Sequence, residues 1–310
     1  MKVYEQESTD PNKKRGKRFG DRRDAWKVRN LDAYSKTVPF LMPDRASSTV
    51  YFKDIIDATN LVEYIKRKNE ELEKLPENER FITKYTYFQV IMTALTRTLA
   101  LKPHMNRFIS GHRIFQRKKI VHIFVAKKAL VEEAIETIVK VAFDRDVCLD
   151  DVAYKLNKNI KEAKNEDDET TDFLKLLMKF PRFLVIIFKK LMDVANYFGL
   201  YPKGIEYIDP MHGSTFVSNL GSIGLENVPF HHLYDRGTCS IFLCVGKIHK
   251  GQIYDKDNGF IEKDILEFSF TIDERISNGF YYIQAINIFK NFITNPELLE
   301  DRLKEVPIDE

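Results

Sequence analysis

One stretch of strict alternation near the C-terminal end restricts the possible folds more than any other feature. Residues 266–272 read LEFSFTI, so that apolar and polar side chains take turns over seven positions. Because successive side chains of a β-strand point to opposite faces of a sheet, this pattern predicts a strand with one buried face. Apolar residues then recur at helical spacing, at Tyr282, Ile286, Phe289 and Ile293, which predicts a helix that begins near Phe280.

The rest of the chain repeats this combination of strands and helices. Apolar strands are predicted at residues 49–56, 120–126 and 240–245, and a hairpin turn at residues 257–259, which read DNG. A helix capped by Asp57 or Thr59 runs to about Leu75, and a second helix with an apolar stripe ends at Pro103. Strands separated by long helices predict an α/β sandwich.

Residues 173–200 are apolar with interspersed lysines, and Pro181 divides them into two predicted helices. Their apolar positions cover more than one helix face, which favours burial against the body of the protein or against a partner subunit. Contact with a membrane surface is the alternative, because a basic amphipathic helix can lie on lipid. We expect no membrane contact.

The chain as a whole is nearly neutral, with 49 Lys and Arg against 46 Asp and Glu, which excludes a general polyanion-binding protein. Positive charge is concentrated in residues 13–23, which hold seven basic residues and one acid. We therefore expect a basic arm over residues 1–30 and a folded domain over residues 31–310. The arm is expected to lie on acidic surface or to help hold a phosphate-rich cofactor. No nucleic-acid partner is expected, because no aromatic platform accompanies the arm.

The three cysteines, Cys148, Cys239 and Cys244, cannot all pair and are typical of reduced core thiols in the cytosol. The first ten residues, MKVYEQESTD, hold no apolar run of the kind a signal peptide needs. The longest uninterrupted apolar run, at 183–188, has six residues, whereas a membrane span needs roughly 20. We expect a cytoplasmic protein.

Two segments carry motifs of a known family. Residues 213–224 read GSTFVSNLGSIG and residues 268–279 read FSFTIDERISNG. Both resemble the catalytic domain of the 2-oxo acid dehydrogenase acyltransferases, the dihydrolipoyl acyltransferases, which share their fold with chloramphenicol acetyltransferase. Three shorter strings agree in order: SKTVP at 35–39, IDATNL at 56–61 and KPHMN at 102–106. The resemblance covers about residues 30–300.

The resemblance implies a two-layer α/β sandwich with a mixed sheet and flanking helices. It also implies a homotrimer, or a multiple of three, with active sites between subunits. Coenzyme A or an acyl-CoA would enter as substrate and meet a small-molecule acyl acceptor there. No lipoyl attachment site is expected, because Lys256 lies at a hairpin tip without a surrounding lipoyl domain.

The same motifs place the catalytic residues that the resemblance implies. The family's base is the histidine of H-x-x-x-D-G, and that position is Glu274 here, with Asn278 in place of the aspartate. Ser218 matches the serine whose hydroxyl stabilises the tetrahedral intermediate. The residues assigned to cofactor contact are Asn219, Gly221 and Arg275.

A glutamate in place of the histidine changes the free energy of proton transfer. With ordinary pKa values of ~8.5 for a thiol, ~6.5 for histidine and ~4.3 for glutamate, the transfer costs about 2.7 kcal/mol to histidine and about 5.7 kcal/mol to glutamate. Burial of the Glu274 carboxyl at an interface would raise its pKa and recover most of this difference in free energy, whereas contact with Arg275 would lower its pKa and enlarge the difference. Two interpretations stay open: Glu274 is a working general base, or it is a carboxylate in a degenerate site.

His231 and His232 are adjacent near a turn and could supply a displaced base, or they form a surface or interface pair. No Cys, Asp or Glu stands at a convincing ligand spacing from them, so no metal site is predicted.

The function expected from the sequence is therefore CoA-dependent acyl transfer to a small acceptor at a subunit interface, with turnover left open. The alternative is a catalytically inactive relative that serves as a CoA-binding or structural trimer.

Overall fold

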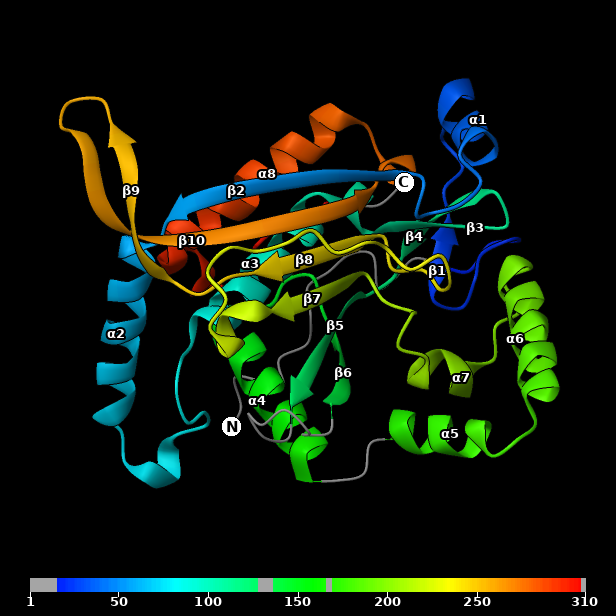
Figure 1. Ribbon diagram of the computed structural model, residues 1–310, viewed down its shortest axis with the longest axis horizontal. Coiled ribbons are helices and arrows are strands. Elements are labelled where there is room, and N and C mark those ends of the chain that lie inside the picture. Colours follow the sequence, from blue (N-terminus) through cyan, green and yellow to red (C-terminus); the bar gives the residue numbers. More distant parts are fainter. Residues whose placement is uncertain (1–15, 128–135, 166–168, 308–310) are drawn as a thin grey trace.

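The computed structural model describes residues 16–127, 136–165 and 169–307. Its centre is a seven-stranded mixed sheet in the order β2-β10-β8-β7-β5-β6, from which β9 and the start of β10 extend as a hairpin (Figure 1). The pairs β5-β7 and β7-β8 are parallel, and the other pairs are antiparallel. The strands are β2 (Thr49–Asp57), β5 (Ile120–Lys127), β6 (Glu136–Phe143), β7 (Thr215–Asn219), β8 (Ile241–Val245), β9 (His249–Asp255) and β10 (Gly259–Asp273).

The alternating segment forms the C-terminal half of β10, so the predicted strand is found. The expectation of one buried face is wrong, because the polar residues Glu267, Ser269 and Thr271 are also buried. The side chains of β10 alternate between the two faces of the sheet, and its two edges pair with β2 and with β8. Phe268, Phe270 and Ile272 point to the helical layer, where they belong to the main core. The expected two-layer arrangement of a mixed sheet with flanking helices is confirmed.

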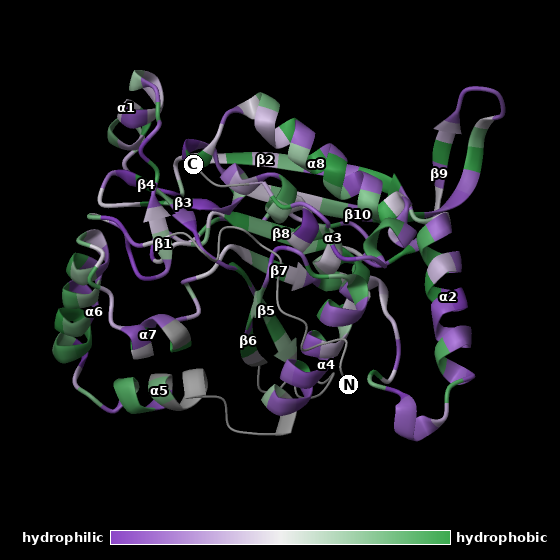
Figure 2. Ribbon diagram, turned by 180° about the vertical axis from the view of Figure 1, so that it is seen from behind, coloured by the Kyte–Doolittle hydropathy of each residue, from purple (hydrophilic) through white to green (hydrophobic). Residues whose placement is uncertain are grey.

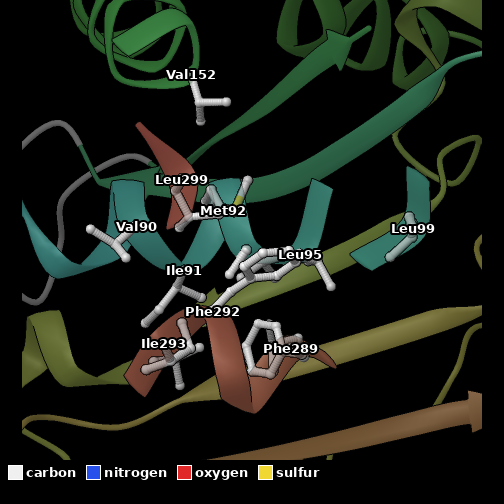
Figure 3. Close-up of a cluster of buried hydrophobic side chains, with 14 of the residues drawn as sticks. Val90, Ile91, Met92, Leu95, Leu99, Val152, Phe289, Phe292, Ile293 and Leu299 are labelled. Atoms are coloured by element: carbon white, nitrogen blue, oxygen red, sulfur yellow. The ribbon is translucent and has the colours of Figure 1, made fainter. Parts of the chain in front are cut away.

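The helical layer supplies the other half of that core. It consists of α2 (Thr59–Glu73), α3 (Tyr87–Leu101), α4 (Leu149–Asn165) and α8 (Gly279–Thr294). Helix α3 is buried on every face over residues 89–100, and Figure 3 shows Ile91 and Leu95 of α3 lying close to Phe289, Phe292 and Ile293 of α8. Pro103 follows the last turn of α3, as expected.

The opposite face of the sheet is covered by the chain between β7 and β8. Phe216 and Phe242 stack there with ring centroids 5.0 Å apart, and Val228 and Leu233 of the covering segment pack into the same cluster. This cluster also contains Cys239 and Cys244, which, like Cys148, are buried and unpaired as predicted.

A separate three-stranded sheet, in the order β1-β4-β3, includes part of the expected arm. It is formed by β1 (Ala25–Lys27), β3 (Arg107–Ser110) and β4 (Arg113–Arg117). The structure differs here from the boundary at residue 30, because Ala25 and Trp26 are buried and pair with β4. Arg22 is also buried, where its guanidinium pairs with Asp24 and donates to the carbonyl of Asn196.

The apolar segment forms α5 (Glu169–Met178) and α6 (Arg182–Tyr197), separated at Pro181 as predicted, and α7 (Lys203–Ile208) follows. The expected burial against the body of the same chain is not found for α6, none of whose residues is buried. Figure 2 shows α6 as a strongly hydrophobic helix at the margin of the molecule. Over the described residues, no helix combines the length and the apolar character that crossing a membrane requires.

The packing of α8 on the sheet gives a first prediction. Phe289→Ala should lower the free energy of unfolding by about 3–5 kcal/mol, because it removes a ring that contacts Phe268 and Phe270 and leaves a cavity. Ile283→Ala, at a position 56% exposed on the same helix, should change it by about 0.5 kcal/mol or less. Chemical denaturation measures both, and similar losses in the two variants would contradict this packing.

Candidate active site

The turn after β10 is fixed by a buried ion pair. Asp273 has no exposed surface, and Arg275 donates to both of its carboxylate oxygens, from Nε and Nη2, at 2.8 Å each. The third guanidinium nitrogen, Nη1, donates to the carbonyl of Met42 at 2.9 Å. Arg275 therefore holds the turn together, and its hydrogen bonds go to Asp273 and Met42 rather than to Glu274.

Glu274 follows directly and lines a cavity of about 790 Å³. Its backbone N–H donates to the carbonyl of Ser48 at 2.9 Å, and its side chain is half-buried. The lining also includes Tyr34 and Ser35 of α1 (Ala33–Leu41), which Asp32 caps by accepting hydrogen bonds from the Ser35 N–H and hydroxyl. The volume is in the range of small-molecule sites.

His104 lines the same cavity, a role that the sequence did not identify. It lies in the short 3₁₀ turn after α3 (Pro103–Asn106), and its ring stacks on Tyr281 of α8 with centroids 4.4 Å apart. Burial, together with Arg107 and Lys102, lowers the pKa of His104 to about 4. His104 is therefore neutral at pH 7 and offers a hydrogen-bonding nitrogen rather than a charge.

Asn278 is the N-cap of α8. Its side-chain oxygen accepts the Tyr281 N–H at 2.9 Å, which satisfies a backbone donor in the first turn of that helix. The preceding turn is supported by Tyr282, whose hydroxyl donates to the Ser277 carbonyl at 2.6 Å and accepts from the Ser277 N–H at 3.1 Å. Asn278 thus anchors the helix start and lines the cavity of Glu274 at the same time.

Ser218 stands at the other end of the sheet, near the end of β7. It is half-buried and faces the same side as Phe216, two residues earlier. The next residue, Asn219, accepts a hydrogen bond from the Tyr87 hydroxyl at 3.0 Å. Gly221 lies in the turn beyond, where a Cβ would collide with the carbonyl oxygen of Gly246 and with the Tyr87 hydroxyl.

The sheet register separates Ser218 from Glu274 within one chain. Ser218 is paired with Cys244, which is in turn paired with Ser269 of β10. Glu274 lies five residues beyond Ser269, a distance of about 16 Å along a strand that is itself two strands away. The structure therefore groups Glu274, Arg275 and Asn278 at one end of the sheet, and Ser218, Asn219 and Gly221 at the other.

His231 and His232 belong to the segment that covers the second face of the sheet. Their rings stack with centroids 4.6 Å apart, and His231 also stacks on Phe242 at 3.9 Å. Neither lines the cavity of Glu274. Within the described ranges, no cluster of His, Cys, Asp and Glu has the arrangement of a metal site.

The steric contact at Gly221 gives a second prediction. Gly221→Ala should destabilise the protein by about 1–3 kcal/mol, because both the Gly246 backbone and Tyr87 must move. Gly204→Ala is the matched control, since no atom lies within 4 Å of the added carbon and alanine favours its helix. Thermal and chemical unfolding measure the difference, and a neutral Gly221→Ala variant would show that the turn does not need glycine.

Comparisons with known proteins agree with these motifs. Residues 203–300 match the family model described as 2-oxoacid dehydrogenases acyltransferase (catalytic domain). A search of curated proteins gave no significant match.

Several solved structures share the fold. A probable dihydrolipoamide acetyltransferase from Listeria monocytogenes 4b F2365 superimposes with a TM-score of 0.56 at 16% identity, over 91% of this chain and 98% of that chain. The dihydrolipoamide acetyltransferase of Azotobacter vinelandii superimposes with a TM-score of 0.55 at 13% identity, over 88% of this chain and 94% of that chain. A chloramphenicol acetyltransferase superimposes with a TM-score of 0.52 at 10% identity, over 87% of this chain and 98% of that chain. Residues 203–300 therefore match the catalytic-domain model of the 2-oxoacid dehydrogenase acyltransferases, and most of the chain has the fold shared by these acetyltransferases and chloramphenicol acetyltransferase.

Proposed function

We propose that this protein is a CoA-dependent acyltransferase, in which an acyl group moves between CoA and a small acceptor at a site between subunits. The observation that carries the proposal is the cavity at the end of β10, whose wall is formed by the family motif from Glu274 to Gly279. Its volume suits the pantetheine arm of CoA together with an acceptor.

Three residues of the Azotobacter vinelandii enzyme support the assignment of roles. That structure was solved to study a serine, a histidine and an asparagine in the catalytic mechanism, with the histidine and asparagine four positions apart. Glu274 and Asn278 have the same spacing, and Ser218 precedes Glu274 by 56 positions, against 52 between the serine and the histidine there. Asn278 thus matches an asparagine of that enzyme, and Glu274 is the residue of the three that differs.

In the proposed reaction, Glu274 takes the proton from the thiol or hydroxyl that attacks the acyl carbonyl of acyl-CoA. When the tetrahedral intermediate collapses, the carbon–sulfur bond to CoA breaks and Glu274 returns the proton to the departing CoA thiolate. The hydroxyl of Ser218 from a neighbouring subunit donates to the oxygen of the tetrahedral intermediate. Arg275 leaves Glu274 available for this role, because its guanidinium is bound to Asp273 and Met42. His104, neutral in the same cavity, can orient the acceptor by a hydrogen bond.

The second candidate is a CoA-binding or structural trimer without turnover. The specific observation that favours it is Glu274 itself, because a carboxylate is a weaker base toward a thiol than the histidine that it replaces. The two candidates share the fold and differ in the rate of the proton transfer.

Assembly into a trimer is part of both candidates. The separation of Ser218 from Glu274 supports it, because the two can contribute to one site only from different subunits. Helix α6 supports it as well, with side chains such as Phe183, Ile187 and Leu191 at least half exposed in the single chain. A cytoplasmic location is proposed with it.

The third prediction concerns the base. Wild-type protein should transfer acetyl groups from acetyl-CoA to dihydrolipoamide slowly, and Glu274→His should gain a factor on the order of 10²–10⁴, because a positioned histidine accepts the thiol proton more easily. Release of CoA thiol between pH 6 and 9 measures both, with Glu274→Gln as the control that has no base. Glu274→His combined with Asn278→Asp tests whether the family's aspartate adds to the gain.

Fast turnover by the wild type that is lost in both Glu274→His and Glu274→Gln would show that the carboxylate is already an effective base. Absence of turnover in every variant, with CoA binding by calorimetry retained, would favour the structural trimer. Absence of CoA binding would contradict both candidates.

The fourth prediction concerns assembly. Light scattering at micromolar concentration should give three times the chain mass of 36.4 kDa, or a multiple of three. Ile187→Lys should shift the distribution toward smaller species, because it places a charge in an apolar contact, whereas Phe260→Lys on the β9-β10 hairpin should not. A monomer or dimer that sediments with anionic vesicles would instead support the membrane-surface interpretation of α6.

A further inference from the structure

A second cavity, of about 660 Å³, lies beside the edge strand β6 and has a strongly basic lining. Its lysines come from separate parts of the chain: Lys140 from β6, Lys155 from α4, Lys203 from α7, and Lys118 and Lys119 from the turn between β4 and β5. Charges of one sign repel one another, so their convergence from four elements indicates a site built for a negative ligand.

The acidic side chains of this lining are already matched. Glu206 forms an ion pair with Arg23, and Asp24 lies 3.8 Å from the guanidinium of Arg117 and also pairs with Arg22. No other acidic side chain among the described residues lines the cavity. The lining therefore holds more basic than acidic side chains, with five lysines and two arginines against two carboxylates.

Arg117 makes the floor of the cavity rigid. Its side chain is buried, and it donates to the carbonyl of Gly213 at 2.9 Å and to the hydroxyl of Thr238 at 2.6 Å. A buried arginine whose donors are directed by the backbone keeps its charge in a fixed place, which is a feature of preorganised anion sites.

Lys140 shows the electrostatic effect of this crowding. Its Nζ donates to the carbonyls of Glu206 and Asp209, at 2.6 Å and 3.2 Å. Burial and the repulsion of Arg117 lower the pKa of Lys140 to about 8, although Asp209, Glu206 and Asp24 act in the opposite direction. An anion in the cavity would relieve this repulsion and favour the charged lysine.

His212 supplies a buried polar group at the same place. It is 3% exposed, stacks on Tyr201 with centroids 4.3 Å apart, and lines the cavity. Its Nδ1 lies 3.4 Å from the Asp209 carboxylate, while its Nε2 has no hydrogen-bond partner among the described residues. Buried polar atoms are normally paired, and within the described part of the chain this nitrogen is left available to a ligand in the cavity that it lines.

We propose that this cavity binds a small molecule that carries two or more phosphate groups. Five lysines require more than one negative charge, lysines are common phosphate ligands, and the volume fits a small molecule. The site is distinct from the proposed active site, because the two cavities share no lining residue. Part of the basic arm belongs to it, since Arg23 lies in its wall.

The fifth prediction uses inorganic tripolyphosphate as the probe with the full chain at 0.15 M salt, roughly physiological ionic strength. Calorimetry should show saturable binding of one molecule per chain. Lys119→Glu combined with Lys203→Glu should weaken it at least tenfold, because both lysines are exposed on the rim and their reversal repels the anion. Lys66→Glu combined with Lys256→Glu changes the net charge equally, on exposed positions away from the cavity, and should leave the affinity within twofold.

The affinity for tripolyphosphate measured over a range of pH tests the contribution of Lys140. Relative to Lys140→Arg, which stays charged, the wild type should lose affinity as the pH rises through about 8, because Lys140 then loses its proton. Protonation of tripolyphosphate affects both proteins equally, so the ratio of their affinities at each pH reports on residue 140 alone.

The source of the phosphates is tested by competition. If CoA occupies this cavity through its phosphates, tripolyphosphate should displace CoA. The Lys119→Glu, Lys203→Glu variant should then bind CoA less tightly, whereas Glu274→Gln should bind CoA as the wild type does. If another phosphate compound is the ligand, CoA should bind this variant normally while tripolyphosphate does not.

Three results would overturn the proposal. The first is the absence of saturable tripolyphosphate binding, and the second is an equal loss of affinity in the control variant. The third is tight binding of a single-stranded oligonucleotide to the same lysines, if tripolyphosphate does not displace the oligonucleotide. None of them bears on the Glu274 cavity, so the proposed acyltransferase function would stand.

Discussion

The buried pair of Asp273 and Arg275 is the interaction on which the candidate active site depends. It joins the end of β10 to the carbonyl of Met42 at the end of α1, and Arg45 adds a second guanidinium 3.5 Å from the same carboxylate. Removal of Asp273 would leave two buried guanidinium groups without their counter-charge, a loss of about 3–5 kcal/mol in comparable pairs. Because Glu274 lies between Asp273 and Arg275, its position in the cavity follows from this pair.

Charge is distributed unevenly over a chain that is nearly neutral overall. The cavity at Glu274 combines the carboxylates of Glu274 and Asp32 with a neutral histidine and two arginines, of which Arg275 is bound to Asp273. The cavity at β6 instead concentrates lysines beside a fixed, buried arginine. In the two proposals, the first cavity holds the reacting thiol and the second holds phosphate groups, and the two cavities share no lining residue.

Local patterns in the sequence predicted the elements that depend on local periodicity. The alternation in β10, the apolar stripe of α3 and the break at Pro181 are all found in the structure. The three-stranded sheet was missed because β1 has three residues and pairs with β4 about ninety positions away, which no local pattern reveals. The same holds for Arg22, which the sequence placed in the basic arm and which is buried in the structure.

The candidate site was predicted in part. The motifs located Glu274, Asn278 and Ser218, but adjacency of Arg275 to Glu274 did not show that its side chain turns toward Asp273. His104 joins the site only because α3 ends beside α8, a tertiary contact that the string KPHMN does not encode.

The most direct measurement is a crystal structure of the assembled protein with CoA. Binding of the thiol in the Glu274 cavity, within hydrogen-bond distance of that carboxylate and facing Ser218 of a neighbouring subunit, is the predicted result. Binding of CoA away from Glu274, or an assembly in which Ser218 and Glu274 of different subunits do not meet, would contradict the proposed function.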